Sequence, residues 1–204
     1  MFRHSPWDFV FFAGFCVYAW TRGVYENRTR LNRRQAEATF PGARLLLAFV
    51  FVGVAGFPVI YLFTPWFAFA DYGLPAWAPW LGTAVMVLAL WLFWRSHSDL
   101  GLNWSMHLEV RTGHELVTSG VYARVRHPMY AAIWAFSLAQ WLLVSNWFAG
   151  PAAAACFAPL YFIRTPREER FLRDVFGPAY DAYRQRTGRL VPRFVKAGPG
   201  GTSA

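Results

Sequence analysis

The chain has 204 residues, of which 56% are hydrophobic and 20% aromatic, and its formal net charge is +9. This composition is too apolar for an ordinary soluble domain of that length, and it predicts one membrane domain. The two cysteines lie inside apolar runs, without a CxxC motif or a Cys/His cluster. We therefore expect neither a disulfide framework nor a zinc site, and we interpret both cysteines as small buried apolar residues.

Five apolar segments follow one another along the chain and predict helices: 9–20, 45–63, 80–94, 130–144 and 151–163. A full span needs about 20 residues, so several of these segments depend on flanking Trp and Tyr residues to reach both interfaces. Helices satisfy the backbone in lipid, and the alternation of a barrel strand is absent. The predicted fold class is all-α: a polytopic membrane protein with about five transmembrane helices and a cytosolic C-terminal helical segment.

The first of these segments follows Arg3 as the core of a signal peptide would, but no small-residue cleavage site comes after it. We expect an uncleaved first helix. Residues 1–195 are predicted to form one membrane domain, whose candidate functional half covers about 97–193. The Gly-rich tail 196–204 is expected to be disordered.

Positive charge is distributed unevenly along the chain. Every Lys and Arg except Arg3 lies after the first, third or fifth apolar segment, and the connections after the second and fourth carry none. Five crossings with this bias place the N-terminus outside and the C-terminus in the cytosol, with the domain in the inner (plasma) membrane if the chain is bacterial. The net charge is thereby explained without nucleic acid, for which no recognition motif stands beside the arginines. The expected partner is instead the lipid bilayer.

The most informative stretch is the polar strip 114–130, which lies between apolar runs. Arg126 and His127 precede Pro128, a residue suited to the first turn of a helix, where free N–H groups and the helix dipole favour an anion. A second polar cluster, Glu168 and Glu169, follows the last apolar segment and could hold an ammonium group. Together these groups suit a small zwitterion, and nearby tyrosines offer faces for a purine or a cation.

This chain resembles the isoprenylcysteine carboxyl methyltransferase and phospholipid methyltransferase group of integral membrane enzymes. The resemblance rests on Leu-Val-Thr-Ser-Gly-Val-Tyr at 116–122 and Arg-His-Pro-Met-Tyr at 126–130. A second block runs from 164 to 192 and contains Arg, Glu-Glu, Phe-Gly and Leu-Val-Pro, and Asn-Trp-Ser at 103–105 also looks like the family. The two blocks cover roughly the C-terminal half of the chain.

The resemblance implies S-adenosylmethionine as methyl donor and a lipophilic small-molecule or lipidated acceptor, with no metal. Position by position, it implies donor contacts at His114, Glu115, Leu116, Val117, Tyr122, His127, Pro128, Met129, Tyr130 and Glu168. The resemblance also implies that Arg164 faces the methyl acceptor and contacts it. A carboxylate acceptor of the isoprenylcysteine type needs no base, whereas an amine or thiol acceptor would need one, and Glu168 or Glu169 would then be the candidate.

Several alternatives remain open at this stage. Thr165-Pro166-Arg167-Glu168 reads as a helix-capping sequence, in which case Glu168 caps a new helix; if one helix continues, Arg164 and Glu168 share a face. Arginine beside a helix start would also suit the phosphates of NADPH in a membrane reductase of the sterol reductase type. A phospholipid or thiol methyltransferase and a non-catalytic scaffold are the other possibilities.

Overall fold

The computed structural model describes residues 5–30, 42–101 and 116–193. Its regular elements there are helices, and two isolated β-bridges accompany them. The long helical passes are α1 (Pro6–Arg30), α2 (Ala43–Phe51) continued by the π-helix η1 (Val52–Gly56) and α3 (Phe57–Phe63), α4 (Ala78–Leu100), α5 (Pro128–Leu143) and α6 (Ala152–Phe176). Shorter elements are η2 (Ala68–Ala70), η4 (Gly120–Ala123) and α7 (Pro178–Arg186). The predicted all-α class is confirmed for the described residues.

Each of the five predicted apolar segments coincides with one helical pass, except that Val144 lies one residue beyond α5 and Pro151 one residue before α6. The passes are longer than the apolar runs at their polar ends, because α1 continues to Arg30 and α6 continues to Phe176. In α6 the helix passes directly through Pro166, so Thr165 and Glu168 do not begin a new helix. The helix-capping interpretation of Glu168 is therefore wrong, and the continuous-helix interpretation is confirmed.

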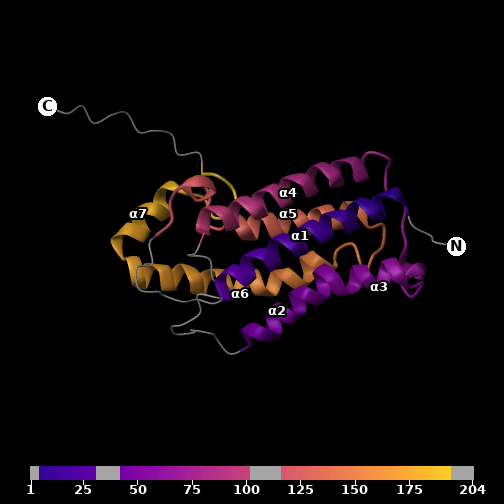
Figure 1. The fold of residues 1–204 in the computed structure, drawn as a ribbon, viewed down its shortest axis with the longest axis horizontal. Helices are drawn as coiled ribbons and strands as arrows, with labels where there is room; N and C mark the ends of the chain where they lie inside the picture. Colours follow the sequence, from indigo (N-terminus) through magenta and orange to yellow (C-terminus); the bar gives the residue numbers. More distant parts are fainter. Residues whose placement is uncertain (1–4, 31–41, 102–115, 194–204) are drawn as a thin grey trace.

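The passes lie side by side and alternate in direction (Figure 1). The end of α1, the start of α2, the end of α4, the start of α5 and the end of α6 all lie at the left of that view, together with α7. The polar residues that follow or precede these helices are thus brought to one end of the bundle, which we call the polar end. The predicted tail 196–204 lies outside the described residues.

Aromatic side chains fill the core between the helices. Phe11 and Tyr18 of α1 pack against Phe136 of α5, with ring centroids 6.1 and 4.9 Å apart, and Tyr18 also lies 4.4 Å from Phe93 of α4. At Gly82, a Cβ atom would come within 2.8 Å of Leu142, so α4 and α5 approach closely there because the residue has no side chain.

Large apolar side chains also point outward. Leu45 is 74% exposed and Phe51 69%, and the exposed apolar residues occur on α1, α4 and α6 as well. Exposed apolar surface of this extent marks an interaction face or a lipid-facing one. Among the described residues, two helical stretches are long and apolar enough to cross a membrane, Ala43–Phe63 with mean hydropathy 2.5 and Ala78–Leu100 with 1.3. Of the two cysteines, Cys156 is buried as predicted, whereas Cys16 is exposed on the outer side of α1, so that part of the prediction is wrong.

Candidate functional site

The candidate site is formed by α5 and α6 where they meet at the polar end. Helix α5 begins with Pro128 after His127 at the N-cap, so the predicted helix start is confirmed. Its first turn carries Tyr130, and the second half of α6 carries Arg164 and Glu168 on one face, because four residues make about one helical turn.

Glu168 is the meeting point of three side chains. Its Oε2 accepts a hydrogen bond of 2.8 Å from the Tyr130 hydroxyl, and its Oε1 accepts one of 2.7 Å from Nε of Arg164. His127 Nδ1 lies 3.8 Å from Oε2, beyond hydrogen-bond range. The imidazole ring stacks parallel to the Tyr130 ring at 5.5 Å. The structure therefore brings together two groups, His127 and Glu168, that are 41 positions apart in the sequence and that were predicted to share one ligand.

Glu169 points to the other side of His127. Its Oε1 lies 3.3 Å from His127 Nε2 and 3.3 Å from Nε of Arg126, and Arg189 donates to both oxygens at 3.2 and 2.7 Å. Burial would raise the pKa of Glu169, but hydrogen bonds and charges from His127 and Arg189 outweigh it and hold that pKa well below its usual range. Glu169 is therefore an ionised group enclosed by cations, and it is a poor candidate for the base that an amine or thiol acceptor would need.

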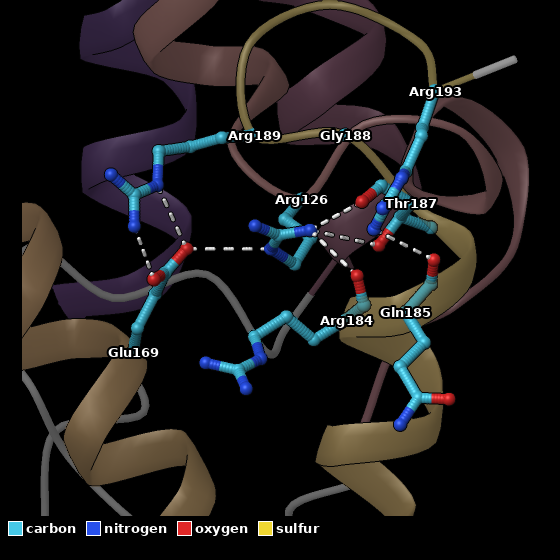
Figure 2. Close-up of a pocket in the computed structure, with 8 residues that line it drawn as sticks. All are labelled: Arg126, Glu169, Arg184, Gln185, Thr187, Gly188, Arg189 and Arg193. Atoms are coloured by element: carbon cyan, nitrogen blue, oxygen red, sulfur yellow. Dashed lines mark hydrogen bonds and ion pairs between the residues drawn. The ribbon is translucent and has the colours of Figure 1, made fainter.

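A cavity of about 430 Å³ opens beside Glu169 at the polar end (Figure 2). Arg126, Arg184 and Arg189 contribute to its lining together with Thr187 and Gly188. Figure 2 shows the Arg126 guanidinium between Glu169 on one side and the backbone oxygens of Arg184 and Thr187 on the other. The cavity is thus polar, and its guanidinium groups are turned toward acceptors of the protein itself.

Tyr122 lies in η4 and is fixed from three directions. Its hydroxyl donates to the Ser96 carbonyl at 3.3 Å, and its own carbonyl accepts a hydrogen bond of 2.7 Å from Tyr183 of α7. Asp99 holds the turn by accepting from the backbone N–H of Val121 at 2.8 Å. Burial, together with the charge of Glu168 and the neighbouring Tyr183, raises the pKa of the Tyr122 phenol, so this side chain offers a neutral ring and not a base.

The remaining predicted site residues are only partly covered by the described structure. Leu116 and Val117 lie in the segment that leads into η4 and are half-buried, as is Met129 in the first turn of α5. His114 and Glu115 fall outside the described residues, as does the 103–105 motif. The other predicted site residues lie on η4, at the start of α5 and in the second half of α6.

Sequence reasoning missed Arg189 and Asp99. Arg189 stands next to Leu190-Val191-Pro192, which carried part of the resemblance, and this proximity was the available signal. For Asp99 the available signal was weaker: it stands four residues after Arg95, the spacing of an ion pair on a helix. In the structure the two side chains are ion-paired at 2.7 Å. Its contact with η4 joins residues 22 positions apart, which no local pattern reveals.

Comparison with known proteins gives an independent result for this region. Residues 80–174 match the model of the Isoprenylcysteine carboxyl methyltransferase (ICMT) family, a little under half of the chain. The resemblance noted from the sequence is confirmed over these residues. They include α5, most of α6, and with them His127, Tyr130, Arg164 and Glu168.

Individual relatives agree with the family match. Protein-S-isoprenylcysteine O-methyltransferase B of Arabidopsis thaliana is 35% identical over 79 residues, which is 39% of this chain and 40% of the plant protein. The protein-S-isoprenylcysteine O-methyltransferase of Homo sapiens is 36% identical over 83 residues, or 41% of this chain and 29% of the human one. That of Schizosaccharomyces pombe is 32% identical over 79 residues, which cover 39% of this chain and 34% of the yeast protein. The chain thus spans less than half the length of these relatives.

Proposed function

On the premise that residues 80–174 are a segment of the isoprenylcysteine carboxyl methyltransferase family, we propose that this protein is an integral membrane methyltransferase. It transfers a methyl group from S-adenosylmethionine to a lipophilic acceptor, a carboxylate of the isoprenylcysteine type. The observation that carries the proposal is the convergence of His127, Tyr130, Arg164 and Glu168 at one end of an apolar bundle.

The proposed membrane arrangement has five spans, with the N-terminus outside and the polar end in the cytosol. Two stretches, Ala43–Phe63 and Ala78–Leu100, have the length and hydropathy of spans, and α1, α5 and α6 lie alongside them (Figure 1). The arginine-bearing ends of these helices gather at the polar end, as the positive-inside rule requires for a cytosolic face. A water-soluble donor would then reach the site from the cytosol, and a lipidic acceptor from the bilayer.

The groups present at the site fit S-adenosylmethionine. Glu168 supplies a carboxylate for the donor's ammonium group, and His127 Nδ1, whose nearest charged neighbour among the described residues is 3.8 Å away, faces the same space. With its proton on Nε2 and donated to Glu169, the ring can accept at Nδ1, which suits the same ammonium group. The N–H groups of the first turn of α5 suit the donor's carboxylate. Tyr122 and Tyr130 supply aromatic faces for the adenine or the sulfonium. His114 to Val117, together with Pro128 and Met129, would complete the donor site.

When bound, the donor supplies a methyl group already attached to a good leaving group, so the protein's task is alignment. Arg164 uses Nε for Glu168, and a guanidinium has further N–H donors on its two Nη atoms. These donors would orient an acceptor carboxylate in the bidentate geometry that arginine favours. A carboxylate is already the nucleophile, so no proton has to leave. The reaction therefore needs no general base, which agrees with the lowered pKa of Glu169, a carboxylate that binds protons weakly.

The test is a transfer assay with purified protein in lipid vesicles and methyl-labelled S-adenosylmethionine. The acceptor is a farnesylated cysteine with a free carboxylate, and the matched control is the same compound as its carboxamide. We expect label in the carboxylate compound alone, released by base as an ester is. Label in phospholipid or in a thiol would change the acceptor class. If the protein binds NADPH and does not bind S-adenosylmethionine, the proposed methyltransferase function is wrong and a reductase function is favoured.

A further inference from the structure

The segment after α7 is joined directly to the residues that precede α5. The backbone N–H of Arg126 donates to the Gly188 carbonyl at 2.8 Å, and that of His127 donates to the Arg189 carbonyl at 3.0 Å. In return the Gly188 N–H donates to the Arg124 carbonyl at 3.1 Å, which makes a short parallel pairing. We call residues 187–189 the clasp. Because the clasp is hydrogen-bonded to the backbone of His127, a shift of the clasp would also move the His127 end of the candidate donor site.

Side chains reinforce the clasp. The Arg126 guanidinium donates through Nη1 to the carbonyls of Arg184 and Thr187, and through Nε to Glu169 (Figure 2). Arg189 of the clasp reaches back to both oxygens of the same carboxylate. Glu169 thus contacts the clasp, Arg126 and the His127 ring together.

Consecutive carboxylates on α6 therefore face opposite sides of one imidazole. Glu168 faces Nδ1, Tyr130 and Arg164, which form the candidate reaction side. Glu169 faces Nε2 and the arginines of the clasp. The Glu169 and His127 side chains are 10% and 6% exposed, so a change at Glu169 is transmitted to the ring and is not absorbed by water.

We propose that Glu169 is a positioning residue of the donor site: anchored by Arg189 of the clasp, it holds the His127 ring by Nε2 so that Nδ1 faces the donor. This inference rests on the proposed function, and it gives the two neighbouring glutamates separate tasks. Glu168 meets the ligand, and Glu169 fixes the group that meets it. It also makes the clasp, which lies beyond the family match at residues 80–174, a part of the site.

The role requires a carboxylate and not merely a polar group of that size. Arg126, Arg189 and His127 all donate to Glu169, and a carboxylate has two acceptor oxygens. A glutamine has one acceptor oxygen and an NH₂ group that is itself a donor. In Glu169→Gln the oxygen would be retained by the guanidinium groups, and the NH₂ group would face His127 Nε2. The ring could then accept there only by carrying its proton on Nδ1, which is the nitrogen turned toward the donor.

The experiment compares wild type, Glu169→Gln and Glu169→Asp, with Asp181→Asn as control. Asp181 is a half-exposed carboxylate of α7 that pairs with Arg173 at 3.1 Å and lies 3.8 Å from Arg184, without contact to Glu169 or His127 in the described ion pairs. Two readouts are used: the KM for S-adenosylmethionine separately from kcat, and the ¹⁵N signals of the His127 ring at alkaline pH, which report the nitrogen that carries the proton. The ring measurement needs no donor and no turnover.

For Glu169→Gln we expect KM for the donor to rise roughly tenfold, the effect of about 1.4 kcal/mol, with a smaller change in kcat. We also expect the ring proton to move from Nε2 to Nδ1. Glu169→Asp should restore part of the affinity, and Asp181→Asn should match wild type. An unchanged ring tautomer in Glu169→Gln would overturn the inference, as would an unchanged KM. If wild type neither binds nor uses S-adenosylmethionine, the proposed function fails instead, and the ring measurement still decides whether Glu169 controls His127.

Discussion

Arg164 and Glu168 form a hydrogen-bonded ion pair of 2.7 Å across one turn of α6, although Pro166 lies between them. Proline removes one backbone hydrogen bond within a helix, yet α6 continues, and both side chains point to the same face. The pair joins the residue proposed for the acceptor to the residue proposed for the donor. A substitution of Arg164 should therefore affect mainly the kinetics of the acceptor, and one of Glu168 mainly those of the donor. Because the two side chains are bonded to each other, each substitution should also have a smaller effect on the other substrate.

Arg164→Lys keeps the positive charge but loses the planar fork of donors. We expect kcat/KM for the prenylcysteine acceptor to fall on the order of a hundredfold, because a lysine cannot orient a carboxylate in two directions. Affinity for S-adenosylmethionine should change much less. Steady-state kinetics with each substrate varied in turn measures both, and Arg170→Lys, at an exposed position of the same helix, is the matched control. Equal losses for donor and acceptor would contradict an acceptor role for Arg164.

Tyr130→Phe removes the hydroxyl that donates to Glu168 at 2.8 Å and leaves the ring in place. A hydrogen bond to a charged group contributes about 1.5–3 kcal/mol, and Arg164 still holds the carboxylate, so we expect roughly tenfold weaker donor binding. Titration calorimetry gives the dissociation constant. The control is Tyr72→Phe, which removes a hydroxyl bonded to the carbonyl of Trp141, near the opposite end of α5 from His127. The idea is wrong if both variants bind the donor equally well.

The enclosure of Glu169 by cations predicts a specific acid sensitivity. Its pKa is lowered in the folded protein, whereas an unfolded glutamate titrates near about 4.3. The stabilisation from this group is therefore fully present above that unfolded value and is lost as pH falls below it toward the folded pKa. Thermal unfolding in detergent should show wild type losing stability over that acid range, and Glu169→Gln should start less stable at neutral pH and lose less. Parallel curves for the two proteins would contradict the ionised, paired state of Glu169.

Gly120→Ala tests the support of Tyr122. Gly120 has φ of +59°, and a Cβ atom there would collide with the Asp99 carboxylate that holds η4. A left-handed conformation alone costs a non-glycine residue about 1–2 kcal/mol, so we expect a lower melting temperature and weaker donor binding. Gly73→Ala is the control, because a Cβ atom there meets no neighbour within 4 Å. Equal melting temperatures for the two variants would show that η4 does not depend on this glycine.

Much of the fold could be predicted because its signals are local. Apolar runs marked the five helical passes, and Pro128 marked the start of α5. The course of the chain at Pro166 could not be decided locally, since Thr165 and Glu168 satisfy a capping pattern as well as a continuous helix. The structure resolves this in favour of the continuous helix, within which Thr165 is buried.

The candidate site was predictable for the side that carries sequence motifs. His127 and Glu168 were expected to meet, and they do. The opposite side was not foreseen, because Glu169 had no sequence property that distinguished it from Glu168. Their separate environments arise from helix geometry and from the clasp, whose Arg189 comes 20 residues later. Such tertiary contacts leave no periodic pattern in a single sequence.

The most direct test of the whole account is the affinity for S-adenosylmethionine of wild type, Glu168→Gln and Asp174→Asn. Asp174 is an exposed carboxylate farther along α6, and its loss changes the net charge equally. We predict that wild type and Asp174→Asn bind the donor alike and that Glu168→Gln binds it at least roughly tenfold more weakly, the loss of about 1.4 kcal/mol of binding free energy. Equal affinity in all three proteins, or no binding by wild type, would contradict the claim that His127 and Glu168 form the donor site.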